Sequence, residues 1–98
     1  MSWYVYLIEC RGGSIYTGIA VDVAARYAAH VAGKGARYTR SRPPQRLLAV
    51  FAMADKSSAL REEHRIKQLS PAQKRALAAA VPAPSAISIP AARSAAAD

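Results

Sequence analysis

Residues 3–20, WYVYLIECRGGSIYTGIA, decide the fold of this chain. Two runs within it, at 3–10 and 15–20, are rich in the aromatic and β-branched side chains that favour strands. The residues between them include two glycines, which can adopt the positive φ that a tight turn requires. The stretch therefore predicts a β-hairpin with one tyrosine in each strand, Tyr6 and Tyr16.

The length of the hairpin loop decides whether these two phenols can act together. A two-residue loop would place Tyr6 and Tyr16 on opposite faces, because side chains alternate along a strand. A three-residue loop at 11–13, with Gly13 in the left-handed conformation, pairs Tyr6 with Gly18 and puts both phenols on one face. We predict this second register, in which Gly18 would leave space beside the phenols for a substrate or water.

The segment after the hairpin predicts a helix that begins at Asp22 and ends at Gly33. Apolar residues recur there at four-residue spacing and form the predicted buried stripe, Val23, Tyr27 and Val31. Arg26 and His30 lie one turn apart on the adjacent face. They are either a solvated pair on the helix surface or part of a site beside the hairpin.

A basic segment follows at 34–46, KGARYTRSRPPQR, which contains no acidic residue. Its two consecutive prolines are expected to keep its second half out of regular structure. Arginines with an interleaved aromatic residue can hold phosphates and stack on a base, although a solvated connector is the plainer alternative. The candidate nucleic-acid-binding residues in this segment are Lys34, Arg37, Tyr38, Arg40 and Arg42.

The second half of the chain predicts a strand at 46–53, apolar throughout and so covered on both faces, and a helix from about 58 to 69. The buried side of this helix is expected to contain Ala59, Leu60, Ile66 and Leu69. Glu62 and Glu63 fall on either side of the centre of that face. Periodicity therefore does not decide which carboxylate points toward the sheet, and both could instead pair with nearby basic residues.

A third helix is expected to begin at Ser70 as N-cap, with Pro71 in the first turn and Gln73 completing a capping box. It should end near residue 80, where prolines follow. We therefore divide the chain into one domain at 1–80 and an alanine- and proline-rich tail of low complexity at 81–98.

The composition points to a polyanionic partner. Fourteen Lys and Arg residues against six Asp and Glu give a net charge of +8 over 98 residues. The single cysteine, Cys10, cannot form an internal disulfide and is expected to be a buried, structural thiol. No apolar run approaches the roughly 18 residues of a membrane span, so we expect a cytoplasmic protein without a membrane partner.

These motifs together resemble the GIY-YIG nuclease superfamily, and in particular its small single-domain UPF0213 (YhbQ-like) group. The resemblance covers roughly residues 3–78 and rests on the spacing of YVY at 4–6, YTG at 16–18, Arg26 and His30, then on GKGARYTR at 33–40 and ALREEHRIKQL at 59–69. Val5 and Thr17 stand where the family motifs have isoleucine, and they keep a similar shape. The resemblance implies an α+β fold, with a three-stranded antiparallel sheet flanked by helices.

The resemblance also implies metal-dependent hydrolysis of phosphodiester bonds in nucleic acid, most readily DNA. By position, Tyr6 and Tyr16 become the motif tyrosines, and Arg26 and His30 the catalytic residues of the first helix. Glu63 becomes the ligand of one divalent ion, Mg²⁺ or Mn²⁺, which a lone carboxylate can hold together with water.

The chemistry of these groups suggests a role for each. Arg26 can form a forked contact with the phosphate, Tyr6 can orient the phosphate or the attacking water, and His30 can hydrogen-bond a phosphate or leaving group. An unperturbed phenol titrates near 10, so a tyrosine that acts as a general base, here Tyr16, needs cations nearby. No small-molecule cofactor is expected.

Two alternatives stay open. Ile19 stands where some related nucleases have a lysine, and no second DNA-binding module is evident, so the scaffold could be a non-catalytic nucleic-acid-binding module. Without such a module, the choice of nucleic acid is expected to rest on the basic segment or on a protein partner. A small structural or oligomeric domain is the third reading.

Overall fold

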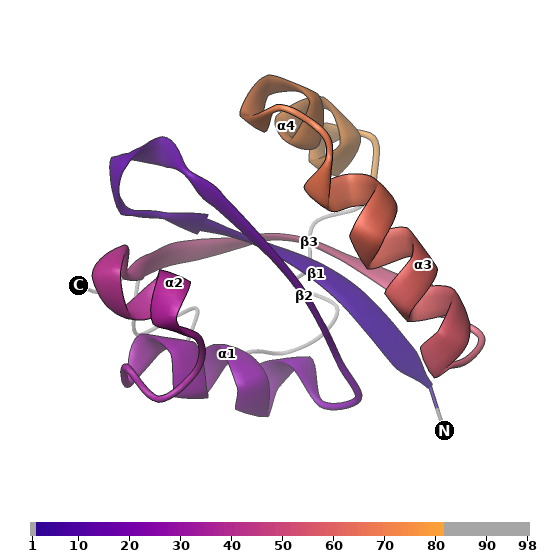
Figure 1. The fold of residues 1–98 in the computed structure, drawn as a ribbon, viewed down its shortest axis with the longest axis horizontal. Coiled ribbons are helices and arrows are strands. Elements are labelled where there is room, and N and C mark those ends of the chain that lie inside the picture. Colours follow the sequence, from indigo (N-terminus) through magenta and orange to yellow (C-terminus); the bar gives the residue numbers. More distant parts are fainter. Residues whose placement is uncertain (1, 82–98) are drawn as a thin grey trace.

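The fold is α+β, as predicted, with a three-stranded antiparallel sheet in the order β2-β1-β3 (Figure 1). The structure is a computed structural model and describes residues 2–81, so the predicted tail lies, except for Val81, outside the described residues. The elements are β1 (Trp3–Cys10), the 3-10 turn η1 (Arg11–Gly13), β2 (Ile15–Ala20), α1 (Val23–Val31), α2 (Arg37–Ser41), β3 (Pro44–Met53), α3 (Lys56–Lys67) and α4 (Pro71–Ala79).

Helices cover both faces of the sheet, and β1 lies at its centre (Figure 1). On one face, α1 packs through Val23 and Tyr27 against β1 side chains that include Ile8 and Cys10. On the other face, α3 contributes Ala59 and Ile66 to a second buried cluster with Val5, Leu7, Ile15 and Ala49 of the sheet, and α4 packs against it. The thiol of Cys10 is buried, in agreement with its predicted structural role.

The third strand differs from the prediction in its start and in its burial. It begins at Pro44, because an edge strand tolerates a residue without a backbone N–H, so the end of the basic segment is regular structure, contrary to the prediction. The short helix α2, earlier in that segment, was not predicted. Only Leu47 and Ala49 of β3 are fully buried. These two residues lie in the cores on opposite faces of the sheet, so β3 is covered on both faces as predicted, but only in part because it is an edge strand.

The first helix has the predicted ends but a different buried face. The Asp22 carboxylate accepts a hydrogen bond from the N–H of Ala25 at 3.0 Å, and Gly33 has a φ of +78° just beyond the helix. Val31, predicted to be buried, is 44% exposed, whereas His30 is completely buried. The stripe prediction is thus wrong at its last position, since the imidazole takes up the interior space.

Helix α3, predicted to begin at about residue 58, begins two residues earlier, at Lys56. The Asp55 side chain caps it by accepting a hydrogen bond from the N–H of Ser58 at 2.7 Å. Ala59 and Ile66 are buried as expected. Leu60 is 46% exposed, so its predicted place in the core is wrong.

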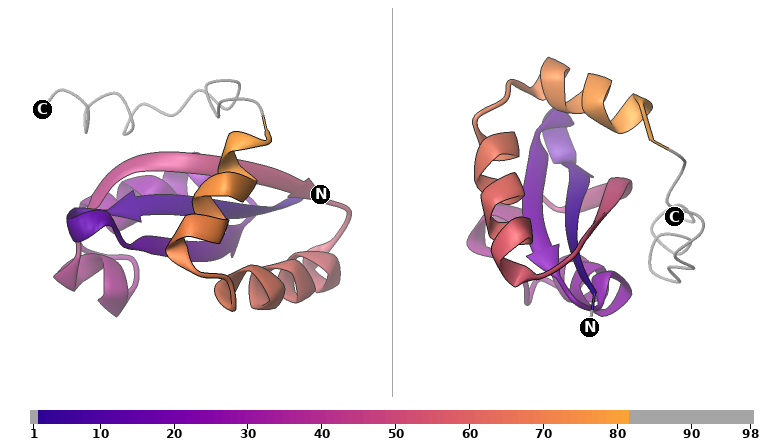
Figure 2. Two further views of the ribbon diagram at one scale, coloured as in Figure 1. Left: turned by 90° about the horizontal axis from the view of Figure 1, so that it is seen from above. Right: turned by 90° about the vertical axis from the view of Figure 1, so that its right-hand side faces the viewer.

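The last helix, α4, begins as predicted and lies across the end of the hairpin (Figure 2). Ser70 and Gln73 form the capping box, with bonds of 2.9 and 3.1 Å. Arg75 donates to the Glu9 carboxylate at 2.6 Å and to the carbonyl oxygen of Gly13 at 2.5 Å. None of the helices formed by residues 2–81 has the length and apolar character that a membrane span needs.

Candidate active site

The hairpin brings Tyr6 and Tyr16 to the same face of the sheet, with ring centroids 6.3 Å apart. Tyr6 pairs with Gly18 across the ladder, which confirms the predicted register. Gly12 and Gly13 in the three-residue loop have φ of +83° and +85°, a conformation that favours glycine. The turn chemistry therefore decides which way both phenols point.

Gly18 makes room for Tyr6, and the expectation that it leaves space for a substrate is wrong. A Cβ atom at this position would lie 2.5 Å from the Tyr6 hydroxyl oxygen and 3.0 Å from the Tyr16 ring. The Tyr6 ring thus lies directly over the glycine, reaching from β1 toward the outer strand β2. A side chain at position 18 would displace it.

A buried chain of hydrogen bonds fixes Tyr6. Its hydroxyl lies 2.9 Å from Nε2 of His30, and Nδ1 of His30 lies 2.7 Å from the Thr39 hydroxyl oxygen. Thr39 in turn donates to the carbonyl oxygen of Ala36 at 3.0 Å and accepts from its N–H at 3.3 Å. Because the only Thr39 proton goes to Ala36, His30 must donate through Nδ1, and Nε2 must accept the Tyr6 proton.

This arrangement corrects the role predicted for His30. The imidazole is fully buried and both of its nitrogens are engaged inside the protein, so it cannot hydrogen-bond a phosphate or leaving group directly. The ring of Tyr16 lies 5.0 Å from that of His30, centroid to centroid. His30 instead holds one phenol and packs against the other. Thr39 was given no role by the sequence, although it lies within the 33–40 motif.

Both buried groups are neutral at neutral pH. Burial, together with the Arg26 charge, lowers the pKa of His30 from 6.5 to about 4. Burial raises the pKa of Tyr6 to about 12; the Tyr16 and Glu63 charges add to the rise, and the Arg26 guanidinium opposes it. Tyr6 is therefore a fixed hydrogen-bond donor and not a base.

The charges of Arg26 on α1 and Glu63 on α3 both act on the pKa of the Tyr6 phenol, which the guanidinium lowers and the carboxylate raises. Arg26 is exposed, and the Glu63 side chain is 18% exposed and pairs with Lys67 at 3.3 Å. Glu62 instead pairs with Arg65 at 2.5 Å. Of the two carboxylates that periodicity left equal, Glu63 is thus the one that acts on the Tyr6 phenol.

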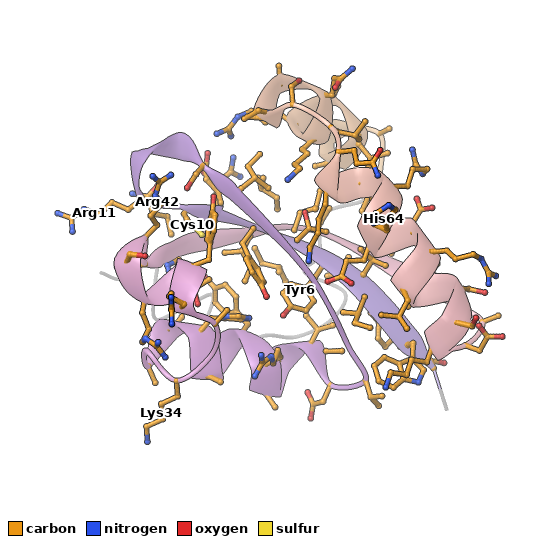
Figure 3. All side chains as sticks on the ribbon, in the orientation of Figure 1. Tyr6, Cys10, Arg11, Lys34, Arg42 and His64 are labelled. Atoms are coloured by element: carbon orange, nitrogen blue, oxygen red, sulfur yellow. The ribbon has the colours of Figure 1, made fainter. Side chains whose placement is uncertain are left out.

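The basic segment places an aromatic side chain, Tyr38, beside Tyr16 and a cationic one, Arg42, over Tyr38; we call this pair the rim. The ring of Tyr38 lies 5.5 Å from that of Tyr16, and Arg42 lies over Tyr38 at 5.8 Å from its centroid. Figure 3 shows Lys34 and Arg11 of the hairpin loop projecting outward, whereas Arg42 lies beside the end of the hairpin. Arg37 and Arg40 are exposed on α2. Of the predicted binding residues, only Tyr38 contacts a motif tyrosine.

Comparison with known proteins identifies the family of this chain. The profile of the GIY-YIG catalytic domain family matches residues 2–76. A UPF0213 protein of Cupriavidus necator is 57% identical over 84% of this chain and 89% of its own length, and one of Halobacterium salinarum is 54% identical over 76% and 96%.

A solved structure is also similar. The solution NMR structure of a UPF0213 protein from Bacillus halodurans is 43% identical and superimposes with a TM-score of 0.53, covering 90% of this chain and 94% of the other. Profile, relatives and fold agree: the chain belongs to the GIY-YIG catalytic domain family, a nuclease superfamily, and within it to the UPF0213 group.

Proposed function

We propose that this protein is a metal-dependent endonuclease that hydrolyses phosphodiester bonds in DNA. One observation carries the proposal: Tyr6 and Tyr16 share one face, and a cation and a carboxylate from opposite helices, Arg26 and Glu63, act on the same phenol. The net charge of +8 supports a polyanionic substrate.

The two phenols have different tasks. Tyr6 keeps its proton because of its burial and its bond to His30, so it orients the phosphate or the attacking water. Tyr16 is half-buried and outside the Tyr6–His30–Thr39 chain. In its phenolate form it takes the proton from the attacking water as the new P–O bond forms, and the leaving oxygen takes a proton from solvent as its bond to phosphorus breaks. His30 and Thr39 act through Tyr6 and are positioning residues.

Arg26 stabilises the charge that spreads over the phosphate oxygens. Its guanidinium is exposed on α1 and lies close enough to the Tyr6 phenol to lower its pKa. A guanidinium can donate two parallel hydrogen bonds to a phosphate, and such fixed donors strengthen as negative charge develops in the transition state.

The residues present fit a divalent ion held mainly by water. Within residues 2–81, no three His, Cys, Asp or Glu side chains gather as a metal cluster. Mg²⁺ and Mn²⁺ accept a single carboxylate because they retain several waters, and Glu63 would supply it. Its pairing with the flexible Lys67 can be exchanged for a metal. When bound, the ion would neutralise charge on the leaving oxygen.

The decisive experiment compares the two neighbouring carboxylates. Supercoiled plasmid, branched DNA and single-stranded DNA are incubated with Mg²⁺ or Mn²⁺ and the wild-type, Glu63→Gln, Glu62→Gln and Tyr16→Phe proteins. We expect cleavage by the wild type and Glu62→Gln, and none by Glu63→Gln or Tyr16→Phe. Mn²⁺ titration should show the same contrast between the two glutamates. Unchanged cleavage by both Glu63→Gln and Tyr16→Phe would refute the assignment.

A binding module without cleavage is the second candidate, favoured by the rim formed by Tyr38 and Arg42 outside the phenol pair. It predicts DNA binding that weakens with added salt and does not depend on Glu63. Salt-insensitive binding would exclude it.

A further inference from the structure

A pocket of about 310 Å³ opens beside Tyr16 at the edge strand β2. Residues from four elements line it: Ile15, Tyr16, Thr17, Tyr38, Lys67 and Lys74. Neither Arg26 nor Glu63 contributes to its lining, so the pocket adjoins the proposed reaction site and is separate from it. Tyr16 belongs to both the pocket and the proposed reaction site.

Thr17 provides an unused donor in this pocket. Its side chain is 98% buried, with 2% exposure, yet its hydroxyl oxygen has no hydrogen-bond partner among residues 2–81. Burying an unpaired polar group is costly, and such groups in native proteins call for an explanation. A ligand with acceptor atoms would satisfy the hydroxyl.

The backbone adds a second donor at the same position. In an antiparallel strand the N–H and C=O groups of one residue point to the same side, and consecutive residues point to opposite sides. The carbonyl of Ile15, two residues before Thr17, points away from β1, toward Lys74. The N–H of Thr17 therefore faces the same open edge of β2.

Two lysines face this pocket. Lys74 is only 9% exposed, and its ammonium group donates to the carbonyl oxygen of Ile15 at 3.4 Å. No carboxylate in the described part of the chain lies within 4.0 Å of it. Burial, followed by the charge of Lys67, lowers the pKa of Lys74. An anion in the pocket would offset both the loss of solvation of the Lys74 ammonium group and its repulsion by Lys67.

We propose that this pocket is a subsite for the phosphate group next to the reacting one in a nucleic-acid strand. Thr17 and Lys74 donate to its oxygens, and Lys67 joins them when Glu63 releases it. Tyr38 supplies an aromatic face for the attached base. The inference rests on the proposed function, because Tyr16 places the two phosphates side by side.

The first test uses Thr17→Val, which removes the hydroxyl and keeps the shape. Binding of fluorescent oligothymidylate is measured without divalent ions, alongside thermal unfolding. We expect binding about tenfold weaker, as for a lost hydrogen bond to a charged group, and a Tm equal to or above that of the wild type. Unchanged binding, or a lower Tm that shows the hydroxyl serves the fold, would overturn the role of Thr17.

The second test uses Lys74→Met, with Lys56→Met as the matched control. Lys56 carries the same charge at the start of α3, where it lies over Trp3 and outside the pocket lining. We expect Lys74→Met to reduce the slope of log affinity against log salt by about 0.7, the value for one lost phosphate contact on a single strand. The control should leave the slope unchanged. Equal slopes for both variants would contradict the subsite.

Two further arms separate the possible ligands and the two proposals. Tyr38→Leu should weaken oligothymidylate binding and leave binding of inorganic phosphate unaffected, whereas equal effects on both would mean a site for the free ion. Cleavage with Mg²⁺ is scored on the same proteins. A wild type that binds through Thr17 and Lys74 but never cleaves refutes only the nuclease. A wild type that cleaves, with KM unchanged in both variants, refutes only the subsite.

Discussion

Tyr6 and Tyr16 come from adjacent strands and share one face, but their surroundings differ. Tyr6 is 1% exposed, lies over Gly18 and is tied to His30, which is tied to Thr39. Tyr16 is half-buried and forms a wall of the pocket with Lys67 and Lys74. The difference shows how one hairpin can make two identical residues unequal, one buried and fixed with its proton and the other partly open to solvent.

The largest expected effect would break this contrast by removing each hydroxyl in turn. Tyr16→Phe should lower the cleavage rate at least about 100-fold, the usual contribution of a general base, with little change in stability. Tyr6→Phe should leave the His30 Nε2 acceptor unpaired and cost about 2 kcal/mol of unfolding free energy as well as activity. Single-turnover cleavage and urea unfolding measure the two. A stability loss in Tyr16→Phe as large as in Tyr6→Phe would contradict the contrast.

Gly18→Ala should disrupt the placement of Tyr6. The added Cβ would lie 2.5 Å from the Tyr6 hydroxyl oxygen, so we expect a destabilisation of about 3 kcal/mol and loss of cleavage. Gly12→Ala is the control: it meets no atom within 4 Å and carries only the strain of its positive φ, about 1 kcal/mol. Urea unfolding of both proteins tests this. Equal losses would mean that backbone strain, and not contact with Tyr6, explains the glycine.

Thr39→Val should sharpen the comparison by removing the far end of the buried chain. The His30 Nδ1–H then loses its acceptor, which should cost about 2 kcal/mol and allow the ring to change tautomer. Thr39→Ser keeps the hydroxyl and should restore most of the stability and the wild-type nitrogen chemical shifts of His30. If Thr39→Val leaves those shifts unchanged, the chain does not set the tautomer.

The smallest expected effect is a pH dependence of stability. The unfolded chain protonates His30 below about pH 6.5, whereas the folded protein holds its pKa at about 4, so the stability is fully present above 6.5 and declines as the pH falls toward 4. We expect a loss of about 1 kcal/mol between pH 6.5 and 5.5. His30→Gln should flatten this part of the curve. His64→Gln, at an exposed histidine bonded to Gln68, should not.

Local chemistry made the hairpin predictable from the sequence. Loop length and glycine placement determined the register of Tyr6 and Gly18, and the capping residues located the start of α4 at Ser70. These features depend on neighbouring residues. The hairpin register and the start of α4 could therefore be predicted from the sequence alone.

The buried chain and the pocket could not be predicted in this way. A helical wheel treats His30 as polar and Val31 as apolar, so it cannot know that Tyr6 and Thr39 will supply partners that make a buried imidazole stable. The pocket brings together Thr17, Tyr38 and Lys74, which are distant in sequence. Only the folded arrangement of β2, α2 and α4 shows that the hydroxyl of Thr17 lacks a partner.

The hydrogen bonds between α4 and the hairpin limit how far this domain can be shortened. Arg75 joins the last helix to Glu9 and Gly13, and Lys74 joins it to Ile15. Trimming the chain after α3 would keep every family tyrosine and the proposed metal ligand, yet would remove the support of the turn that aims them. We therefore expect the smallest autonomous unit to extend through α4, so that a fusion partner is better attached beyond it.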